Sequence, residues 1–206
     1  MVYKFDPVYW NGTIFHLDEA TWKMSGDWDE YRPRNLPIPA SCFPKTLNFD
    51  RARAPLPDMF HTARDIIVFS DRARVVIERS APGEVEFIPV ACHADRAIAA
   101  KLKLASAYFF INVLGRAQRL RWREVPTEKY PRRPDGTELF GLLQDYSRWL
   151  LRERAAGEPM IWHDTPWRDG NKEYRGQNEI LIEDSLWREL NAEFPGQLNA
   201  LRAGEA

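Results

Sequence analysis

Residues Ile66 to Val90 carry the longest run of mutually consistent local signals in the chain. A β-branched run at 66–69 predicts a buried strand, and Ser70 with Asp71 offers side-chain oxygens that can cap a helix. The apolar residues at 73, 76 and 77 then follow helical spacing, and Pro82-Gly83 stops the helix before a second apolar run. The sequence therefore predicts strand, cap, helix, turn and strand in succession.

A second passage, near residue 180, repeats this order. Ile180 to Ile182 favours a strand, Asp184 or Ser185 can cap a helix, and Pro195-Gly196 stops it. A shift of about 113 positions superposes the two passages without a gap, which indicates either internal duplication or convergence on good capping chemistry. Both origins predict an α+β fold with a mixed or antiparallel sheet, helices packed on one face and two strand-cap-helix units.

The N-terminal quarter has a different character. Aromatic and polar residues alternate from Tyr3 to Leu17, and Asn11-Gly12 is a pair that type I′ hairpin turns prefer. Six prolines between residues 31 and 58 disfavour both helix and central strand there. We therefore expect an N-terminal hairpin and proline-rich segment over 1–56 and an α+β domain over 57–206, packed together as one compact unit.

The remaining pattern predicts several further elements. They are a short helix at 58–63, a helix at 95–106, a core strand at 108–114 that continues to 122, an amphipathic helix at 139–155, a short strand at 160–163 and a polar loop at 164–177. In the strand that continues to 122, we expect Leu120 and Trp122 to point inward and Arg119 and Arg121 outward.

The charge balance and the cysteines limit the class of protein. Lys+Arg 29 against Asp+Glu 30 gives a net charge of -1, which disfavours a general affinity for nucleic acid or anionic membrane. Cys42 and Cys92 are far apart and suit a reducing cytoplasm in which both stay thiols, with a single disulfide as the alternative. No run approaches the about 18 apolar residues that span a bilayer. We expect a soluble cytoplasmic protein.

The sequence contains none of the common nucleotide or nucleophile motifs. G-x-x-x-x-G-K, G-x-G-x-x-G and G-x-S-x-G are absent, so no cofactor is predicted. Cys92 and His93 are neighbours on a predicted strand and point to opposite faces, so they cannot form a catalytic pair there. His93 with Asp95 could supply two metal ligands, but a site needs at least a third, and no metal site is predicted.

Two clusters combine charged and aromatic residues. The first, at 163–175, could hold an acid and a base, bind a partner, or be a plain solvent-exposed connection. The second, at 22–31, could attract a basic partner or cover the core. The residues that we predict to contact a partner are Trp28, Asp29, Trp167 and Arg168.

Six short motifs follow one another between Pro57 and Gly196. They are Pro57-Asp58-Met59-Phe60, Ile67-Val68-Phe69-Ser70-Asp71, Glu86-Phe87-Ile88-Pro89-Val90, Tyr108-Phe109-Phe110-Ile111-Asn112-Val113-Leu114, Ile161-Trp162 and Ile180-Leu181-Ile182-Glu183-Asp184. Their succession resembles a bacterial family, first catalogued as a domain of unknown function, of immunity proteins from interbacterial and polymorphic toxin systems. The resemblance implies a protein that binds a cognate toxin and performs no catalysis.

The leading hypothesis is a cytoplasmic immunity protein that neutralises one cognate secreted toxin, such as a type VI secretion effector, by direct contact. An alternative is a small enzyme with its active site in the 163–175 loop, built on His163, Asp164 and Glu173. A third is a phage or secretion-system adaptor, which the neighbouring genes would distinguish. Under the leading hypothesis there are no catalytic, cofactor-binding or metal-binding residues.

Overall fold

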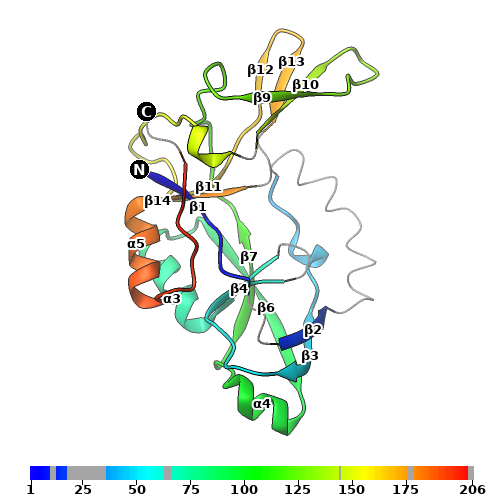
Figure 1. The fold of residues 1–206 in the computed structure, drawn as a ribbon, viewed down its shortest axis with the longest axis vertical. Helices are drawn as coiled ribbons and strands as arrows, with labels where there is room; N and C mark the ends of the chain where they lie inside the picture. Colours follow the sequence, from blue (N-terminus) through cyan, green and yellow to red (C-terminus); the bar gives the residue numbers. More distant parts are fainter. Residues whose placement is uncertain (10–12, 18–35, 63–65, 144, 176–178, 204–206) are drawn as a thin grey trace.

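The structure is a computed structural model of the 206-residue chain, and it describes residues 1–9, 13–17, 36–62, 66–143, 145–175 and 179–203. The strands of this part form sheets of six, five and four strands. The molecule is elongated, with the four-stranded sheet at one end and α4 at the other (Figure 1). The α-helices described are α3 (Asp71–Ser80), α4 (Arg96–Leu102) and α5 (Asp184–Glu193), with 3-10 turns η2 (Ala40–Cys42) and η3 (Tyr146–Arg148).

The six-stranded sheet has the order β2, β3, β6, β7, β5, β4. Neighbouring strands are antiparallel except β3 and β6, which are parallel, so the sheet is mixed. Its strands are β2 (Thr13–Leu17), β3 (Thr46–Ala52), β4 (Met59–His61), β5 (Ile67–Ser70), β6 (Val85–Ala94) and β7 (Tyr108–Val113). Every residue of β7 is buried, as expected for a strand near the middle of a sheet that is covered on both faces.

Alternating side chains give this sheet two apolar faces. Phe69 and Ile111 belong to a cluster with residues of α3 and α5, whereas Val68 and Phe110 belong to a second cluster that includes Leu102 of α4. The helices therefore cover both faces. The expectation of helices on one face is wrong, because β5 and β7 carry apolar residues on both sides and each side requires cover.

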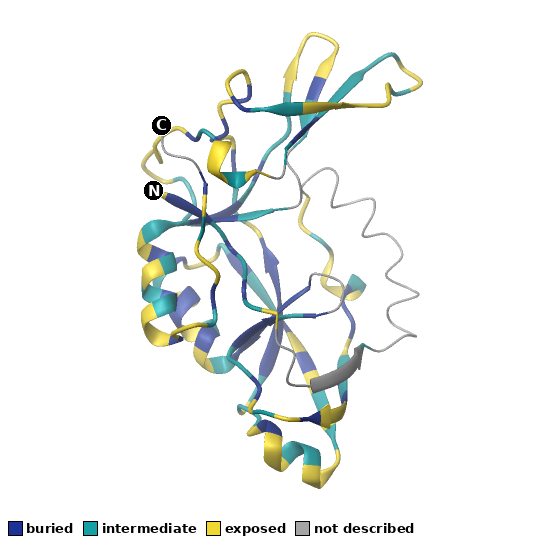
Figure 2. Ribbon diagram, viewed as in Figure 1, coloured by how far each residue is buried: buried dark blue, intermediate teal, exposed yellow. Residues whose placement is uncertain are grey.

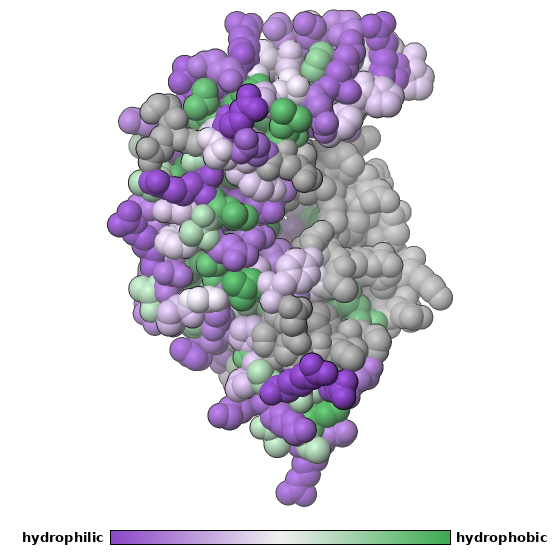
Figure 3. Space-filling view, in the orientation of Figure 1, coloured by the Kyte–Doolittle hydropathy of each residue, from purple (hydrophilic) through white to green (hydrophobic). Residues whose placement is uncertain are grey.

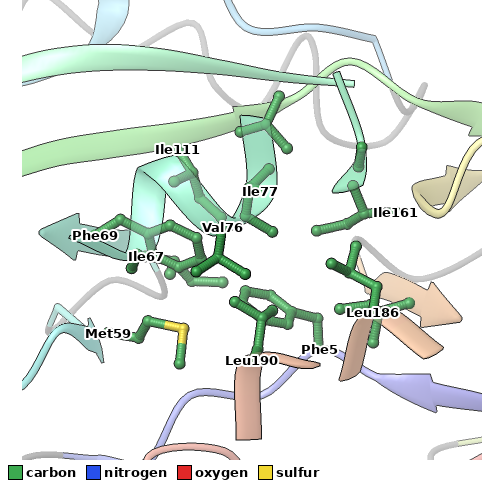
Figure 4. Packing of buried hydrophobic residues seen from close by; sticks show 14 of the residues in the cluster. Phe5, Met59, Ile67, Phe69, Val76, Ile77, Ile111, Ile161, Leu186 and Leu190 are labelled. Atoms are coloured by element: carbon green, nitrogen blue, oxygen red, sulfur yellow. The ribbon is translucent and has the colours of Figure 1, made fainter. Parts of the chain in front are cut away.

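Figure 4 shows the first cluster from close by. Val76 and Ile77 of α3 point toward Leu186 and Leu190 of α5, and Ile161 reaches the same cluster from the five-stranded sheet. Full burial of such side chains contributes about 1.5–3 kcal/mol each. Because two sheets share these contacts, the cluster fixes the position of one sheet against the other.

The five-stranded sheet brings the beginning and the end of the described chain side by side (Figure 1). Its strand nearest the N-terminus, β1, pairs antiparallel with two strands that lie about 180 or more residues later in the sequence. The order is β15 (Leu201–Arg202), β1 (Val2–Lys4), β14 (Ile180–Glu183), β11 (Ile161–Asp164) and β8 (Arg116–Ala117).

The N-terminal quarter contributes to both large sheets. Strand β1 joins the five-stranded sheet, whereas β2 pairs with β3 in the six-stranded sheet. The predicted N-terminal hairpin is therefore wrong: the alternating aromatic residues serve two sheets, and the Asn11-Gly12 turn lies outside the described residues. Strands from 1–56 thus share sheets with strands from 57–206, and the proposed boundary between these segments stays a prediction.

The four-stranded sheet has the order β12 (Trp167–Asp169), β13 (Lys172–Arg175), β10 (Glu138–Leu142) and β9 (Thr127–Tyr130). It replaces two predictions, the amphipathic helix at 139–155 and the polar loop at 164–177. Between 139 and 155 the chain forms β10, η3 and an isolated bridge from Leu151 to Leu120. The helical spacing of its leucines was misleading, because Leu142, Trp149 and Leu151 reach a third core cluster from an extended chain.

The two strand-to-helix transitions differ in their caps. Ser70 caps α3 as predicted, with its Oγ accepting a hydrogen bond from the backbone N–H of Ala73 at 3.2 Å. At α5 the N-cap residue is Glu183, which makes no capping hydrogen bond with its side chain. The predicted cap at Asp184 or Ser185 is wrong, and Asp184 instead binds Arg188 one turn later.

Two other predictions are corrected by burial. The segment expected to be a helix at 58–63 contains strand β4, because Met59 and Phe60 are both fully buried and serve opposite clusters of the core. The expected strand at 117–122 is regular only in β8. Leu120 and Trp122 are buried as predicted, but Arg119 is buried too, at 3 % exposure, and not outward.

Candidate partner-binding site

The predicted partner contacts are only partly within the described structure. Trp28 and Asp29 lie outside the described residues. Trp167 and Arg168 are adjacent on β12, so their side chains project from opposite faces of the four-stranded sheet. A single flat partner surface on this sheet can therefore contact only one of these two side chains.

The hairpin of β12 and β13 turns at Gly170 and Asn171, since Asp169 pairs with Lys172. Gly170 has a φ of +58°, a conformation that a residue with a Cβ adopts only with strain. A two-residue turn with glycine first is typical of a type II′ hairpin. The sequence Asp169-Gly170-Asn171 is thus a hairpin signal within the segment expected to be a polar loop.

Aromatic rings cross one face of the sheet. The Tyr174 ring lies 4.9 Å from that of Phe140 and 5.0 Å from that of Trp167, on strands paired at these positions. Trp122 continues the row at 5.9 Å from Tyr174, and the Arg123 guanidinium lies over Trp167 at 5.4 Å. Trp167 and Tyr174 pack against the third core cluster, so this face supports the sheet on the rest of the molecule.

The opposite face carries an arginine cluster, which we define as Arg133, Arg168 and Arg175 around Glu173. The Glu173 side chain is 5 % exposed, whereas that of Arg168 is 73 % exposed. Arg168 donates from Nε and Nη2 to Oε2 at 3.1 and 2.8 Å. Arg133 donates from Nη2 to Oε1 at 3.1 Å, and Arg175 from Nε to Oε1 at 2.5 Å. Three cations thus converge on one carboxylate.

A further charge that acts on this cluster is Asp135, in the turn between β9 and β10. The backbone N–H of Thr137 lowers the pKa of Asp135, and the charges of Arg133 and Arg168 add to that effect. Asp135 therefore balances one of the cations from an exposed position. Three arginines against Glu173 and Asp135 leave a formal charge of +1, and Glu128 on β9 lies farther across the same face of the sheet.

The side chains of the enzyme hypothesis are engaged by different partners. His163 Nδ1 lies 3.1 Å from the carbonyl oxygen of Glu179. Asp164 accepts hydrogen bonds from the backbone N–H groups of Arg119 and Leu120 at 2.7 and 3.2 Å. Glu173 belongs to the other sheet and binds arginines. The hydrogen bonds of these three side chains therefore go to separate groups.

Asp164 is part of a buried polar group that sequence analysis missed. Burial raises the pKa of its carboxyl to about 6, although the two backbone N–H groups oppose that shift. The Arg119 guanidinium binds the Glu183 carboxylate and the Arg152 carbonyl, and it lies 4.4 Å from the Trp162 ring. These bonds hold the chain after β8 against β11 and β14.

A second polar network was also missed, because its members are scattered in the sequence. Lys4 Nζ lies 3.0 Å from the Glu179 carboxylate and donates to the Tyr146 hydroxyl at 3.1 Å. Lys4 also lies 3.8 Å from Asp6, which in turn lies 3.5 Å from His61 Nε2. The network ties β1 to β4, η3 and the start of β14, which is a structural role.

The remaining candidates for metal and thiol chemistry are Asp95 and the two cysteines. Asp95 caps α4, with its Oδ1 accepting from the backbone N–H of Ile98 at 2.7 Å. Cys42 and Cys92 form no disulfide with each other, so that alternative is wrong, and burial raises the pKa of Cys92 to about 11. Among the described residues, His, Cys, Asp and Glu form no group of three or more suited to a metal ion.

The described helices are all too short or too polar to cross a bilayer. No protein-family model matches the sequence, and a search among curated proteins finds no significant match.

Proposed function

We propose that the protein is a cytoplasmic immunity protein that binds and neutralises one cognate bacterial toxin. The proposal rests on the two faces of the four-stranded sheet. One face packs against the third core cluster, and the other carries the arginine cluster. Arginine and aromatic residues are the commonest anchors of protein interfaces. The resemblance of the sequence to immunity proteins supports a toxin as the partner.

The position of the sheet also supports a binding role. Helices α3, α4 and α5 pack on the six- and five-stranded sheets, and the four-stranded sheet lies at the far end from α4 (Figure 1). Figure 2 shows its strands mostly in the colours of intermediate and exposed residues, and Figure 3 shows a largely hydrophilic surface at this end. A sheet displayed in this way can cover a toxin's active site without rearrangement of the core.

Neutralisation follows from steric cover in this proposal. A bound protein that buries about 800 Å² on each partner can exclude substrate from a neighbouring active site. The free protein needs no catalytic group for this, only a rigid surface with a few strong anchors. Inhibition should therefore be stoichiometric, with one immunity protein required for each toxin molecule.

The direct test is coexpression with the product of the neighbouring gene. We expect the two proteins to copurify and the cells to survive a toxin that kills them when it is expressed alone. Survival should depend on the ratio of the two proteins. Failure both to form a complex and to protect the cells would contradict the proposal.

Single alanine substitutions at Trp28, Asp29, Trp167 and Arg168 locate the surface. Arg168 is the sharper probe of the described pair, because Trp167 also packs on Tyr174 and its loss would weaken the sheet itself. Arg79→Ala on α3 is a matched control, since its side chain is 57 % exposed and also pairs with a glutamate. Unchanged affinity in all four variants would remove these residues from the interface.

A further inference from the structure

We propose that the arginine cluster of the four-stranded sheet is the docking site for an acidic segment of the partner protein. The inference rests on the proposed function and names the chemistry of the partner's surface. The cluster would receive a carboxylate side chain, an aspartate or a glutamate, between the outer faces of Arg168 and Arg133.

Glu173 holds the arginines in place for such a ligand. Its carboxylate is 5 % exposed and receives Arg133, Arg168 and Arg175 through both oxygens. Arginine otherwise loses considerable rotamer freedom when it binds an anion. Since Glu173 has already ordered the three guanidinium groups, less entropy is lost when a partner carboxylate arrives.

The guanidinium groups keep donors for a second anion. Each guanidinium has five N–H donors in a planar fork, and Glu173 has only two oxygens. Arg168 contacts Glu173 through Nε and Nη2 and Arg133 through Nη1 and Nη2, while their side chains remain 73 % and 32 % exposed, so a further anion can approach both guanidinium groups from solvent. The planar fork matches a carboxylate through two parallel hydrogen bonds.

The charge pattern favours an acidic protein segment over a polyanion. Three arginines face Glu173 and Asp135, which leaves a small positive excess in one place. The other face of the sheet pairs Arg123 with Asp169, and the chain as a whole has a net charge of -1. Nucleic acid binding normally requires an extended basic surface that follows many phosphates.

An ion-pair cluster of this kind exceeds what stability requires. One arginine is enough to neutralise Glu173, and exposed ion pairs such as that of Arg168 contribute only about 0–1 kcal/mol. Gathering three cations on one carboxylate adds repulsion among them. A carboxylate from the partner protein would reduce that repulsion, and this reduction would contribute to the affinity for an acidic ligand.

Charge reversal at Arg168 is the main test, with the purified product of the neighbouring gene as the probe. We expect Arg168→Glu to raise the Kd of the complex at least about tenfold, because it places like charges in the interface. Arg168→Lys should cause a smaller loss, since lysine keeps the charge without the planar fork. Circular dichroism and thermal unfolding check that both variants remain folded.

The matched control is Arg188→Glu on α5. Arg188 is 65 % exposed and pairs with Asp184, so the substitution changes net charge equally at a distant place. The Kd of the complex with the Arg188→Glu protein should change less than about twofold.

Rising salt should weaken the wild-type complex more than the Arg168→Glu complex. An acidic residue of the toxin changed to arginine should restore binding to Arg168→Glu.

The outcomes separate the two proposals. A wild-type complex that Arg168→Glu leaves unchanged would overturn the docking inference and leave the proposed function standing. The absence of any wild-type complex would overturn both. Binding of a single-stranded oligonucleotide that depends on Arg168, with the protein complex unaffected, would assign the cluster to nucleic acid and overturn the inference.

Discussion

The six-stranded and four-stranded sheets use their faces in opposite ways. The first is covered on both faces, and all residues of β7 are buried. The second packs through its aromatic face and leaves the arginine cluster on the other. The difference separates a sheet buried in the core from a sheet with one exposed, charged face, so a substitution on that exposed face need not lower the stability of the fold.

The largest expected effect compares one substitution in each sheet. Phe110→Ala in β7 removes a fully buried ring and should lower the free energy of unfolding by about 3–5 kcal/mol. Phe140→Ala in β10 removes a half-buried ring, and we expect a loss of about 1–2 kcal/mol. Chemical denaturation measures both values.

Equal losses at Phe110 and Phe140 would break the comparison, because they would make the four-stranded sheet as much a part of the core as the six-stranded one. Phe109→Ala provides a second value from β7, where the ring lies on the face of α3 beneath the guanidinium of Arg74.

A somewhat smaller effect is expected where the six-stranded sheet meets the five-stranded sheet. A Cβ at Gly115 would lie 2.1 Å from the backbone carbonyl oxygen of Ile161, so one strand must move. We expect Gly115→Ala to lower the free energy of unfolding by about 3 kcal/mol. Gly157→Ala measures the cost of backbone conformation without a clash, since φ there is +82° and a Cβ meets nothing within 4 Å. A loss at Gly115 no greater than at Gly157 would show that the close approach is not required.

The buried Asp164 should make stability depend on pH. Burial raises the pKa of its carboxyl to about 6, from an ordinary value of 3.8, so the folded protein favours the protonated form. Its contribution is therefore fully present below pH 4 and is lost as the pH rises through 6, by up to about 3 kcal/mol. Asp164→Asn should lack this dependence. Parallel pH profiles for the two proteins would refute the assignment.

The smallest effect should be confined to the four-stranded sheet. Gly170→Ala puts a side chain at a φ of +58°, which costs about 1–2 kcal/mol. Hydrogen exchange should quicken in β12 and β13 while the protection of β7 stays unchanged. A uniform loss of protection in both sheets would show that they unfold as one unit, which would also break the comparison.

The same difference explains which parts of the fold the sequence could predict. The strands around Ile67, Val85 and Tyr108 are runs of apolar residues bounded by caps and turns, and they were predicted correctly. Strands β12 and β13 are rich in charged residues and resemble a loop by composition. The turn at Gly170 was the sequence feature that indicated a hairpin there. The charged residues did not indicate strands, because the pairing of β12 and β13 depends on tertiary contacts.

The candidate site was predictable only in part. Arg168 was predicted from its place in a charged and aromatic segment, but Arg133 and Glu173 could not be joined to it without knowledge of the parallel pairing of β10 and β13. The burial of Arg119 was hidden for a similar reason. On a regular strand, Arg119 would point outward because it alternates with the buried Leu120. The regular strand β8 ends before Arg119, so this alternation does not apply.

The position of β1 has a consequence for how the chain folds during synthesis. Val2–Lys4 is translated long before both of its partners, β14 and β15. The six-stranded sheet needs nothing beyond Val113 for its own strands, and it can assemble while β1 waits unpaired. Strands β14 and β15 therefore complete the five-stranded sheet only when they are translated and pair with β1, and a chain truncated before Ile180 should leave the β1 segment open to protease.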